Sequence, residues 1–242
     1  MTPKQLYQRG LADGHIMPDA AQADAIEHLD ALFHRLVEAP PRREPATWWA
    51  RWRKPAPCKP VRGLYMWGGV GRGKTFLMDT FYEALPFSEK RRMHFHRFMR
   101  HVHQSLRELQ SVKNPLQTVA ERIAEDTRVI CFDEFFVTDI TDAMLLAGLF
   151  ESLFDLGVTL VATSNIVPQE LYKDGLQRSR FLPAIALIAE HTEVINVDGG
   201  TAYRLRTLEQ AELYHAPLDA GADQSLLSSF RQLAPVHGLA TP

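Results

Sequence analysis

The residue types and spacing best suited to chemistry lie in a glycine-rich run, Gly68-Gly-Val-Gly-Arg-Gly-Lys-Thr75. The run fits the pattern G-x-x-x-x-G-K-[ST] between an apolar stretch and a helical pattern, the context that supports this motif. Its backbone N–H groups can face one anion, and the N-terminus of the following helix adds positive partial charge. We expect Lys74 at the β- and γ-phosphates of a nucleotide and the Thr75 hydroxyl on Mg²⁺. The predicted phosphate-binding residues are Gly68, Gly69, Val70, Gly71, Arg72, Gly73, Lys74 and Thr75.

Two carboxylates follow a second apolar run, residues 129–132. If this run is a strand, Asp133 and Glu134 lie at its carboxyl end, where open α/β sheets bind their ligands. We expect Asp133 to hold Mg²⁺ through water and Glu134 to orient or deprotonate an attacking water. The pair favours hydrolysis, because a phosphotransferase does not need a carboxylate that activates water.

A third apolar run, residues 158–162, ends in Thr-Ser-Asn165. An amide at Asn165 could contact the γ-phosphate or hold the attacking water. Ser-Asn is also ordinary turn chemistry, and the turn is the alternative explanation. The two preceding motifs favour a functional Asn165.

Two arginines, Arg178 and Arg180, lie between the predicted fourth and fifth strands. A permanently charged, planar guanidinium suits an arginine finger that is donated to a neighbouring subunit's γ-phosphate. A surface salt bridge is the alternative for either residue. The finger is the favoured reading, with Arg180 slightly ahead of Arg178.

Four histidines, His94, His96, His101 and His103, cluster within ten residues. On a predicted strand over residues 93–98, His94 and His96 would share a face, whereas His101 and His103 on a following helix would not. No cysteine or paired carboxylate completes a set of zinc ligands. The sequence therefore disfavours a metal site and favours a role for His96 or Arg97 near the γ-phosphate.

These side chains need a framework of alternating strands and helices, which is typical of a parallel sheet covered on both faces. Strands are predicted over residues 63–67, 93–98, 129–132, 158–162 and 193–197. Helices are predicted over residues 74–85, from the end of the second strand to about residue 110, and over residues 139–156. We divide the chain into a helical N-terminal region (1–39), a basic Pro/Trp-rich connector (40–62), an α/β core (63–206) and two short helical patterns (207–242).

Composition excludes several classes of protein. The longest apolar run near the middle, residues 143–150, is far shorter than the ~20 residues of a membrane-spanning helix. No secretory signal is visible, and two cysteines favour a reducing compartment, the cytosol. Residues 1–128 hold 21 basic and 14 acidic side chains (+7), and the remainder hold 6 and 15 (−9). Opposite charges favour head-to-tail self-association into a ring, unless both sets are simply solvated.

Taken together, the motifs resemble the ZapE family of AAA+ ATPases, the bacterial cell-division ATPase and its mitochondrial relatives. The resemblance covers most of residues 7–206. Its stretches are Pro18-Asp-Ala-Ala-Gln22, Gly63-Leu-Tyr-Met-Trp-Gly-Gly-Val-Gly-Arg-Gly-Lys-Thr75, His94-Phe-His-Arg-Phe-Met99, Cys131-Phe-Asp-Glu-Phe135, Ala162-Thr-Ser-Asn165, Gly175-Leu-Gln-Arg-Ser-Arg-Phe-Leu-Pro183, Val197-Asp-Gly-Gly200 and Tyr203-Arg-Leu-Arg206.

The resemblance implies an AAA+ P-loop NTPase with a five-stranded parallel sheet in the order 5-1-4-3-2. It implies ATP and Mg²⁺ as ligands and ATP-driven remodelling of a protein partner: the tubulin-like division protein in bacteria, or a quality-control substrate in mitochondria. We expect the bacterial, cytoplasmic case, with peripheral membrane association left open. Family members usually continue well past residue 242, through a helical lid and a second sensor arginine. Arg231 matches no family motif, so the chain is expected to be truncated.

Three functions compete at this point. The first is the ATP-driven protein remodeller. The second is a nucleic-acid-handling ATPase such as a helicase loader, for which the basic segment 42–62 would supply phosphate contacts. The third is a nucleotide-gated interaction module with little hydrolysis. The first is favoured, and nucleic acid is the less favoured partner.

Overall fold

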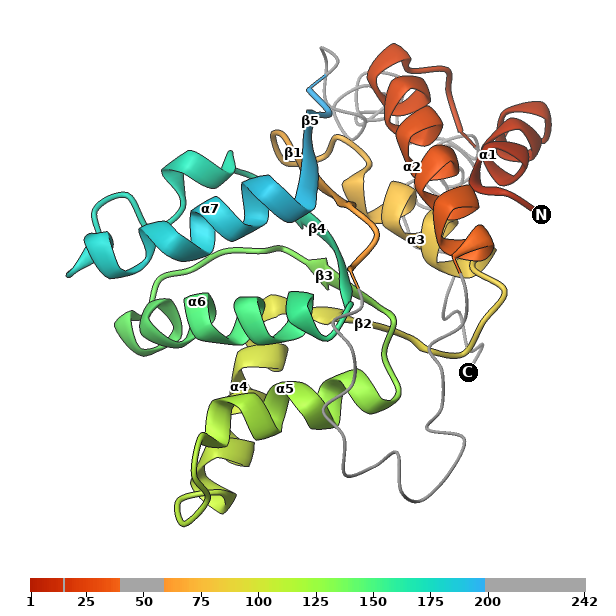
Figure 1. Cartoon of the computed structure of the whole chain (residues 1–242). Helices are drawn as coiled ribbons and strands as arrows, with labels where there is room; N and C mark the ends of the chain where they lie inside the picture. Colours follow the sequence, from red (N-terminus) through yellow and green to blue (C-terminus); the bar gives the residue numbers. More distant parts are fainter. Residues whose placement is uncertain (15, 40–58, 199–242) are drawn as a thin grey trace, which may run out of the picture. The chain divides into compact units, whose positions relative to one another are not determined.

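The computed structural model describes residues 1–14, 16–39 and 59–198 of the chain (Figure 1). Residues 1–69 with 73–199 form one compact unit and residues 70–72 with 200–242 another; the fold below is that of the first. Five parallel strands pair in the order β2-β3-β4-β1-β5, which confirms the expected order 5-1-4-3-2 from the other edge. The strands are β1 (Gly63–Trp67), β2 (Lys90–His94), β3 (Val129–Asp133), β4 (Thr159–Ser164) and β5 (Thr192–Asn196).

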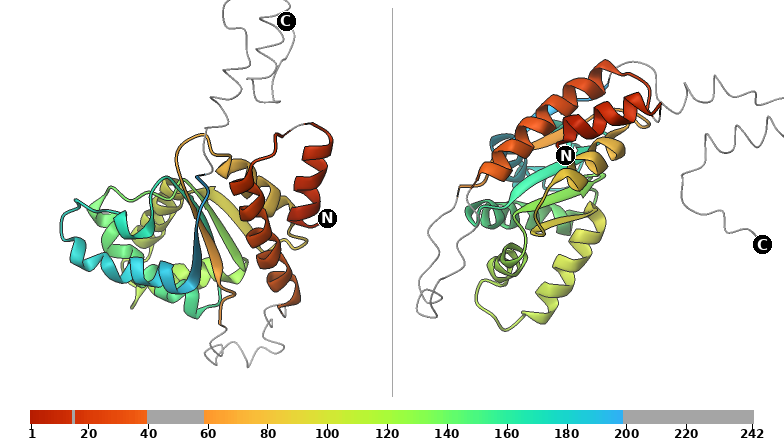
Figure 2. Two further views of the ribbon diagram at one scale, coloured as in Figure 1. Left: turned by 90° about the horizontal axis from the view of Figure 1, so that it is seen from above. Right: turned by 90° about the vertical axis from the view of Figure 1, so that its right-hand side faces the viewer.

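Helices cover both faces of this sheet, as expected (Figure 2). The α-helices are α1 (Pro3–Ala12), α2 (Ala20–Glu38), α3 (Lys74–Ala84), α4 (Phe95–Glu108), α5 (Pro115–Glu125), α6 (Ile140–Asp155) and α7 (Leu182–His191); short 3-10 turns are η2 (Pro168–Glu170) and η3 (Arg178–Arg180). Alternate residues of β3 point to opposite faces: Ile130 and Phe132 pack with α4–α7, and Val129 and Cys131 pack with α1–α3. Two hydrophobic cores therefore hold the sheet between them.

The central strands are apolar because both of their faces are covered. Close pairing also constrains residue size: a Cβ on Gly63 would lie 1.8 Å from the Leu160 carbonyl oxygen, so only glycine fits at the start of β1. This fit sets β1 beside β4 in the register Leu64↔Val161.

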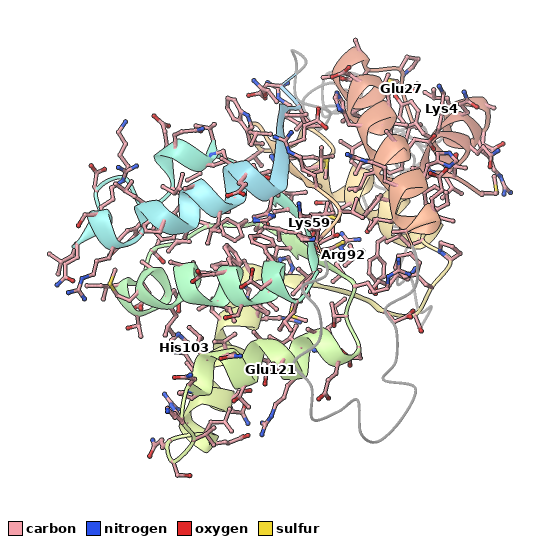
Figure 3. The ribbon with its side chains drawn as sticks, in the orientation of Figure 1. Lys4, Glu27, Lys59, Arg92, His103 and Glu121 are labelled. Atoms are coloured by element: carbon pink, nitrogen blue, oxygen red, sulfur yellow. The ribbon has the colours of Figure 1, made fainter. Side chains whose placement is uncertain are left out.

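The N-terminal region comprises two helices, α1 and α2. A capping box between Thr2 and Gln5 begins α1, and the Asp19 side chain caps α2. An exposed ion pair between Lys4 Nζ and Glu27 Oε1, 2.7 Å apart, links the two helices (Figure 3). Both helices pack on α3 through the core that also contains Leu64 of β1.

The strand predicted over residues 93–98 is wrong. β2 spans Lys90–His94, and the chain becomes helical at Phe95 because Phe95, Phe98, Met99 and Val102 form one apolar stripe that is buried against β3 and α5. Helices α5 and α7 were not predicted. In α7 the sequence is apolar almost all round, which weakens the periodic signal of a helix.

Several expectations lie outside the described residues. The tryptophan-rich part of the connector (40–58), the helical patterns after residue 206 and Arg231 all belong there. Within the described ranges, no helix is long and apolar enough to cross a membrane.

Candidate active site

The candidate site lies along the carboxyl edge of the sheet, because all five strands are parallel. The predicted phosphate-binding loop follows β1. Asp133 is the last residue of β3 and Glu134 follows it, and Asn165 directly follows β4. In the strand order, β3 and β4 are neighbours and β4 pairs with β1. The tertiary structure thus brings the three predicted motifs to one edge.

The loop after β1 leads directly into α3. Gly73 precedes the helix in a left-handed conformation (φ 81°), and Thr75 is exposed in the first turn. Lys74 Nζ donates hydrogen bonds to the carbonyl oxygens of Gly68 (2.6 Å) and Gly69 (2.7 Å). The ammonium therefore lies at the loop itself, where the motif requires a cation. Val70, Gly71 and Arg72 complete the loop in the sequence between Gly69 and Gly73.

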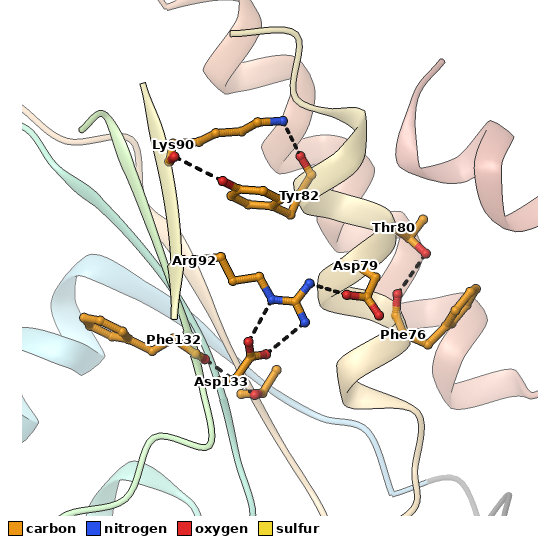
Figure 4. Close-up of polar contacts among 9 residues, drawn as sticks. Phe76, Asp79, Thr80, Tyr82, Lys90, Arg92, Phe132 and Asp133 are labelled. Carbon is orange, nitrogen blue, oxygen red and sulfur yellow. Dashed lines mark hydrogen bonds and ion pairs between the residues drawn. The ribbon is translucent and has the colours of Figure 1, made fainter. Parts of the chain in front are cut away.

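Asp133 is held by an arginine that the sequence reading did not identify. Arg92 Nε lies 2.7 Å from Asp133 Oδ2 and Arg92 Nη2 lies 3.2 Å from Asp133 Oδ1, a bidentate pair. The Arg92 Nη1 atom also donates to Asp79 of α3, so one guanidinium joins β2, β3 and α3 (Figure 4). Burial alone would lower the pKa of Arg92, but hydrogen bonds to both carboxylates raise it above its ordinary value.

The donor atoms at this point fit Mg²⁺, which prefers carboxylate, hydroxyl and phosphate oxygens. Thr75 and Asp79 are four residues apart on α3 and so share a side of the helix. Asp79 and Asp133 bind the same guanidinium, so the Thr75 side of α3 faces the end of β3. The Thr75 hydroxyl and the Asp133 carboxylate are therefore the residues that would hold the ion.

Glu134 contrasts with its neighbour. Its side chain is 77% exposed, against 13% for Asp133. Its backbone φ is 53°, a left-handed value that is uncommon for a residue with a side chain and is often found at functional sites. The Glu134 N–H donates to Thr163 Oγ1 (3.2 Å), which ties this turn to β4. The turn directs Glu134 away from the core while Asp133 stays in it.

Hydrogen bonds from the end of β4 hold this turn in place. Phe135 N–H donates to the Thr163 carbonyl (2.7 Å), and Ser164 Oγ donates to the Phe135 carbonyl (2.8 Å). Ser164 is buried, whereas Asn165 is exposed in the bend that follows. Asn165 is thus both a turn residue and a polar side chain at the edge, so the two alternatives are compatible.

The two candidate finger arginines differ in environment. Both lie in η3, and Arg178 Nη2 donates to the Gln169 carbonyl (2.6 Å), which ties η3 to η2. Arg180 is exposed, and in the part of the chain described here its side chain has no hydrogen bond or ion pair.

The histidine cluster splits between two elements. His94 ends β2 and His96 lies in α4, yet their rings stack with centroids 5.7 Å apart. His94 Nδ1 lies 4.0 Å from Glu134 Oε2, and His103 Nε2 lies 2.6 Å from Asp142 Oδ1. Among residues 1–14, 16–39 and 59–198, no group of three or more histidines, cysteines and carboxylates is arranged to hold a metal ion.

Sequence reasoning missed Arg92, Asp79 and Asp198. The Asp198 Oδ1 atom accepts a hydrogen bond from Gly69 N–H (3.0 Å) and so fixes the start of the phosphate-binding loop. The available signal for Arg92 was a charged residue inside a strand-forming run, Lys90-Arg-Arg-Met-His94, because a charge facing a core needs a partner.

Known proteins are similar to this chain in sequence and in fold. The family model described as AFG1-like ATPase matches residues 1–241. The chain is 53% identical over 225 residues to "Cell division protein ZapE" of Escherichia coli strain K12, covering 90% of this chain and 60% of that protein. It is 42% identical over 187 residues to "Lactation elevated protein 1 homolog B" of Danio rerio, covering 72% of this chain and 37% of that protein. The chain thus spans 60% or less of the length of these two relatives.

A solved structure, AMPPCP-bound DnaA from Aquifex aeolicus, superposes with a TM-score of 0.51 at 14% identity, covering 90% of this chain and 61% of that one. At that identity the likeness shows the fold alone. The match of the family model over nearly the whole chain and the ordered motifs at the sheet edge lead to one conclusion: the chain belongs to the AFG1-like ATPase family.

Proposed function

We propose that the protein binds ATP with Mg²⁺ at the carboxyl edge of the sheet and hydrolyses it. The observation that carries this proposal is the meeting of a phosphate-binding loop with an Asp–Glu pair at one edge, with Glu134 exposed and Asp133 held in place. Membership of a family of ATPases supports the same activity.

Each residue has a separate task in the reaction. The loop N–H groups and Lys74 bind the β- and γ-phosphates, and Thr75 and Asp133 hold the ion. An ion held by Thr75 and Asp133 would neutralise negative charge on the phosphates. Glu134 accepts a proton from the water that attacks the γ-phosphorus, while the bond to the β–γ bridging oxygen breaks and ADP leaves. Asn165 orients that water or the γ-phosphate.

We propose that hydrolysis drives remodelling of a protein partner, the tubulin-like division filament, in the bacterial cytoplasm. The 53% identity to an E. coli protein named for cell division supports this choice over a mitochondrial role. Completion of the site by a neighbouring subunit belongs to the same proposal. The exposed Arg180, unpartnered within the described chain, and the +7 and −9 halves of the sequence support head-to-tail rings.

Glu134→Gln tests the hydrolytic assignment. The amide keeps the shape of the side chain but cannot take a proton, so phosphate release should fall about 10²–10⁴-fold while labelled ATP still binds. Lys74→Ala should instead lose ATP binding. The matched control is Glu121→Gln, an exposed α5 glutamate bonded to Gln117, which should keep the parental rate. Hydrolysis at the parental rate in Glu134→Gln would remove Glu134 from its role.

The partner is tested separately. Purified division filaments should change length or bundling when the protein and ATP are added, and should not respond with the Glu134→Gln variant. Filaments that are unaffected by the active protein would contradict the partner and leave the ATPase assignment in place.

A further inference from the structure

We propose that the groove between α4 and the start of α6 binds an extended, acidic segment of the protein partner. This inference rests on the partner remodelling proposed above, and it names the place and the chemistry of the contact. Lys74 and Glu134 are not among the residues that line the groove, so the partner and ATP would be bound by different side chains.

Two helices of the same compact unit form the groove, which has a volume of about 620 Å³. Clefts that bind ligands usually have volumes of this order. One wall is a single side of α4, which carries His96, Arg100, His103 and Arg107 at helical spacing. The other wall is the first turn of α6 together with Asp139, the residue that caps it.

The two sides of α4 differ in how far the rest of the chain satisfies them. Its apolar side is buried in the core that α4 shares with α5 and α6. On the groove side, Arg100 and Arg107 are both exposed, and among the described residues neither has a hydrogen bond or an ion pair. Packing within the chain thus accounts for the apolar side of α4 but supplies no anion to these two guanidinium groups.

The carboxylates of the groove have other contacts. Asp142 Oδ1 lies 2.6 Å from Nε2 of His103, which is labelled in Figure 3, so this pair joins the two walls. Asp139 Oδ1 accepts hydrogen bonds from the N–H groups of Thr141 (2.6 Å) and Asp142 (3.3 Å) at the start of α6. The positive charge of Arg100 and Arg107 therefore remains available to a ligand.

The two arginines define the charge and the length of the expected ligand. They lie seven positions apart on α4, which separates their backbones by about 10 Å along the helix axis. An extended peptide rises about 3.3 Å per residue, so acidic side chains three or four residues apart span this distance. A guanidinium can bind a carboxylate through two parallel hydrogen bonds, which makes arginine well suited to this contact.

An acidic peptide fits the groove better than a nucleic acid does. A nucleic acid carries a negative charge at every phosphate, and some of these charges would lie close to Asp139 and Asp142. A peptide carries carboxylates only at some positions and presents uncharged N–H donors at the others. The mixed charges of the two walls therefore favour a protein segment.

Phe136 adds an apolar contact near the α6 wall. It is 57% exposed, although aromatic side chains contribute most when they are buried. It precedes Asp139 by three residues, so it lies within about 11 Å of that residue. Aromatic residues and arginine are enriched in protein–protein interfaces. We therefore expect the bound segment to carry an apolar side chain beside its carboxylates.

The groove also lies beside the proposed site of hydrolysis. The ring of His96, which lines the groove, stacks on the ring of His94 with centroids 5.7 Å apart. His94 Nδ1 lies 4.0 Å from Oε2 of Glu134. A segment bound in the groove is thus separated by two histidine rings from the carboxylate that we assign to water activation.

The experiment measures binding of fluorescent peptides to the full chain by anisotropy at low salt. The acidic probe is a glycine–serine peptide with one leucine and two aspartates four residues apart, and the neutral probe has asparagines in place of the aspartates. The parent should bind the acidic probe about twenty-fivefold more tightly than the neutral one. Arg100→Gln and Arg107→Gln should each weaken binding of the acidic probe about fivefold, and the double variant about twenty-fivefold.

The matched control is Arg122→Gln, which removes the same charge from an exposed position of α5 outside the groove and should keep the parental affinity. Equal weakening in Arg122→Gln and in the α4 variants would indicate non-specific attraction and would overturn the inference. A parent that binds both probes alike would overturn it as well. Tighter binding of single-stranded oligothymidine than of the acidic probe, lost in Arg100→Gln, would assign the groove to nucleic acid instead.

Further measurements separate this inference from the proposed function. The double variant should bind labelled ATP and hydrolyse it at the parental rate, which also shows that it is folded, but it should no longer act on division filaments. Phe136→Ser should weaken binding of the acidic probe, and should not weaken binding of a version with glycine in place of leucine. If the parent hydrolyses ATP but does not bind the acidic probe, the groove assignment is wrong and the ATPase assignment stands. If it binds the probe through Arg100 and Arg107 but does not hydrolyse ATP, the ATPase assignment is wrong and the groove assignment stands.

Discussion

Two arginine-bearing regions of this molecule differ in how far their charges are satisfied within one chain. Between β2, β3 and α3, Arg92 is 17% exposed and binds the carboxylates of Asp79 and Asp133. In η3, Arg180 is exposed, and no residue in the described part of the chain pairs with it. The first region is complete in a single subunit, whereas the second presents a free guanidinium.

This difference has a physical consequence. A nearly buried guanidinium costs much desolvation energy unless it is paired, so Arg92 must be matched by carboxylates during folding. An exposed guanidinium stays hydrated without a partner in its own chain, and it remains able to bind an anion of another molecule. We therefore expect Arg92 to act mainly on stability and on the position of Asp133, and Arg180 to act on the rate of an assembled complex.

The largest expected effect is that of Arg180→Ala on hydrolysis. If Arg180 completes a neighbour's site, phosphate release should fall about 10³–10⁵-fold, or about 4–7 kcal/mol in the barrier, with ATP affinity close to that of the parent. Steady-state hydrolysis at saturating ATP measures the rate of phosphate release, and titration with labelled ATP measures the ATP affinity.

Mixing tests whether the finger acts between subunits. Arg180→Ala combined with Lys74→Ala should recover part of the activity, because an intact site then meets an intact finger. Specific activity of the parent should also rise with protein concentration. If the rate per subunit does not change with concentration and mixing recovers no activity, Arg180 does not act in a neighbouring subunit's site. The proposed difference between the two arginine regions would then be wrong.

Arg92→Leu should have the next largest effect, on folding stability. Removing the guanidinium leaves the Asp133 carboxylate nearly buried without its bidentate partner, which should lower the free energy of unfolding by about 3 kcal/mol. The matched control is Arg91→Leu on the same strand, whose pair with Asp126 is exposed and should change stability by less than about 1 kcal/mol. Urea unfolding measures both, and equal losses would contradict the special role of Arg92.

Arg178→Ala should have a smaller effect, and this effect should be on folding stability and not on the hydrolysis rate. The variant loses the hydrogen bond from Arg178 Nη2 to the Gln169 carbonyl, which should cost about 1 kcal/mol of stability. Its hydrolysis rate per assembled complex should stay near that of the parent. A loss of rate like that expected for Arg180→Ala would move the finger role to Arg178.

The smallest expected effect is that of Asp79→Asn. Asp79 is 49% exposed, and its amide replacement can still accept a hydrogen bond from Arg92. We expect a loss below about 1 kcal/mol in urea unfolding. A loss as large as that of Arg92→Leu would mean that Asp79, rather than Asp133, is the main partner of the guanidinium.

The sequence alone determined the parts of this protein whose physics is local. Glycines, a lysine and a threonine at fixed spacing identify a phosphate-binding loop because the contacts come from consecutive residues at a helix N-terminus. Apolar runs that end in carboxylates identify β3 and, with the runs at β1 and β4, a parallel sheet. The family resemblance then supplied the strand order, which the structure confirms.

Only the tertiary structure decided which distant side chains meet. Arg92 and Asp133 are 41 residues apart and become partners because β2 and β3 pair in one register, with Arg92 opposite Cys131. Gln22 reaches Gly73 only because α2 packs on α3. The end of β2 at His94 was also settled by burial, since Phe95 and Phe98 gain more by facing the α4–α7 core than by extending a strand. Contacts of this kind depend on packing between elements, and no spacing along the chain encodes them.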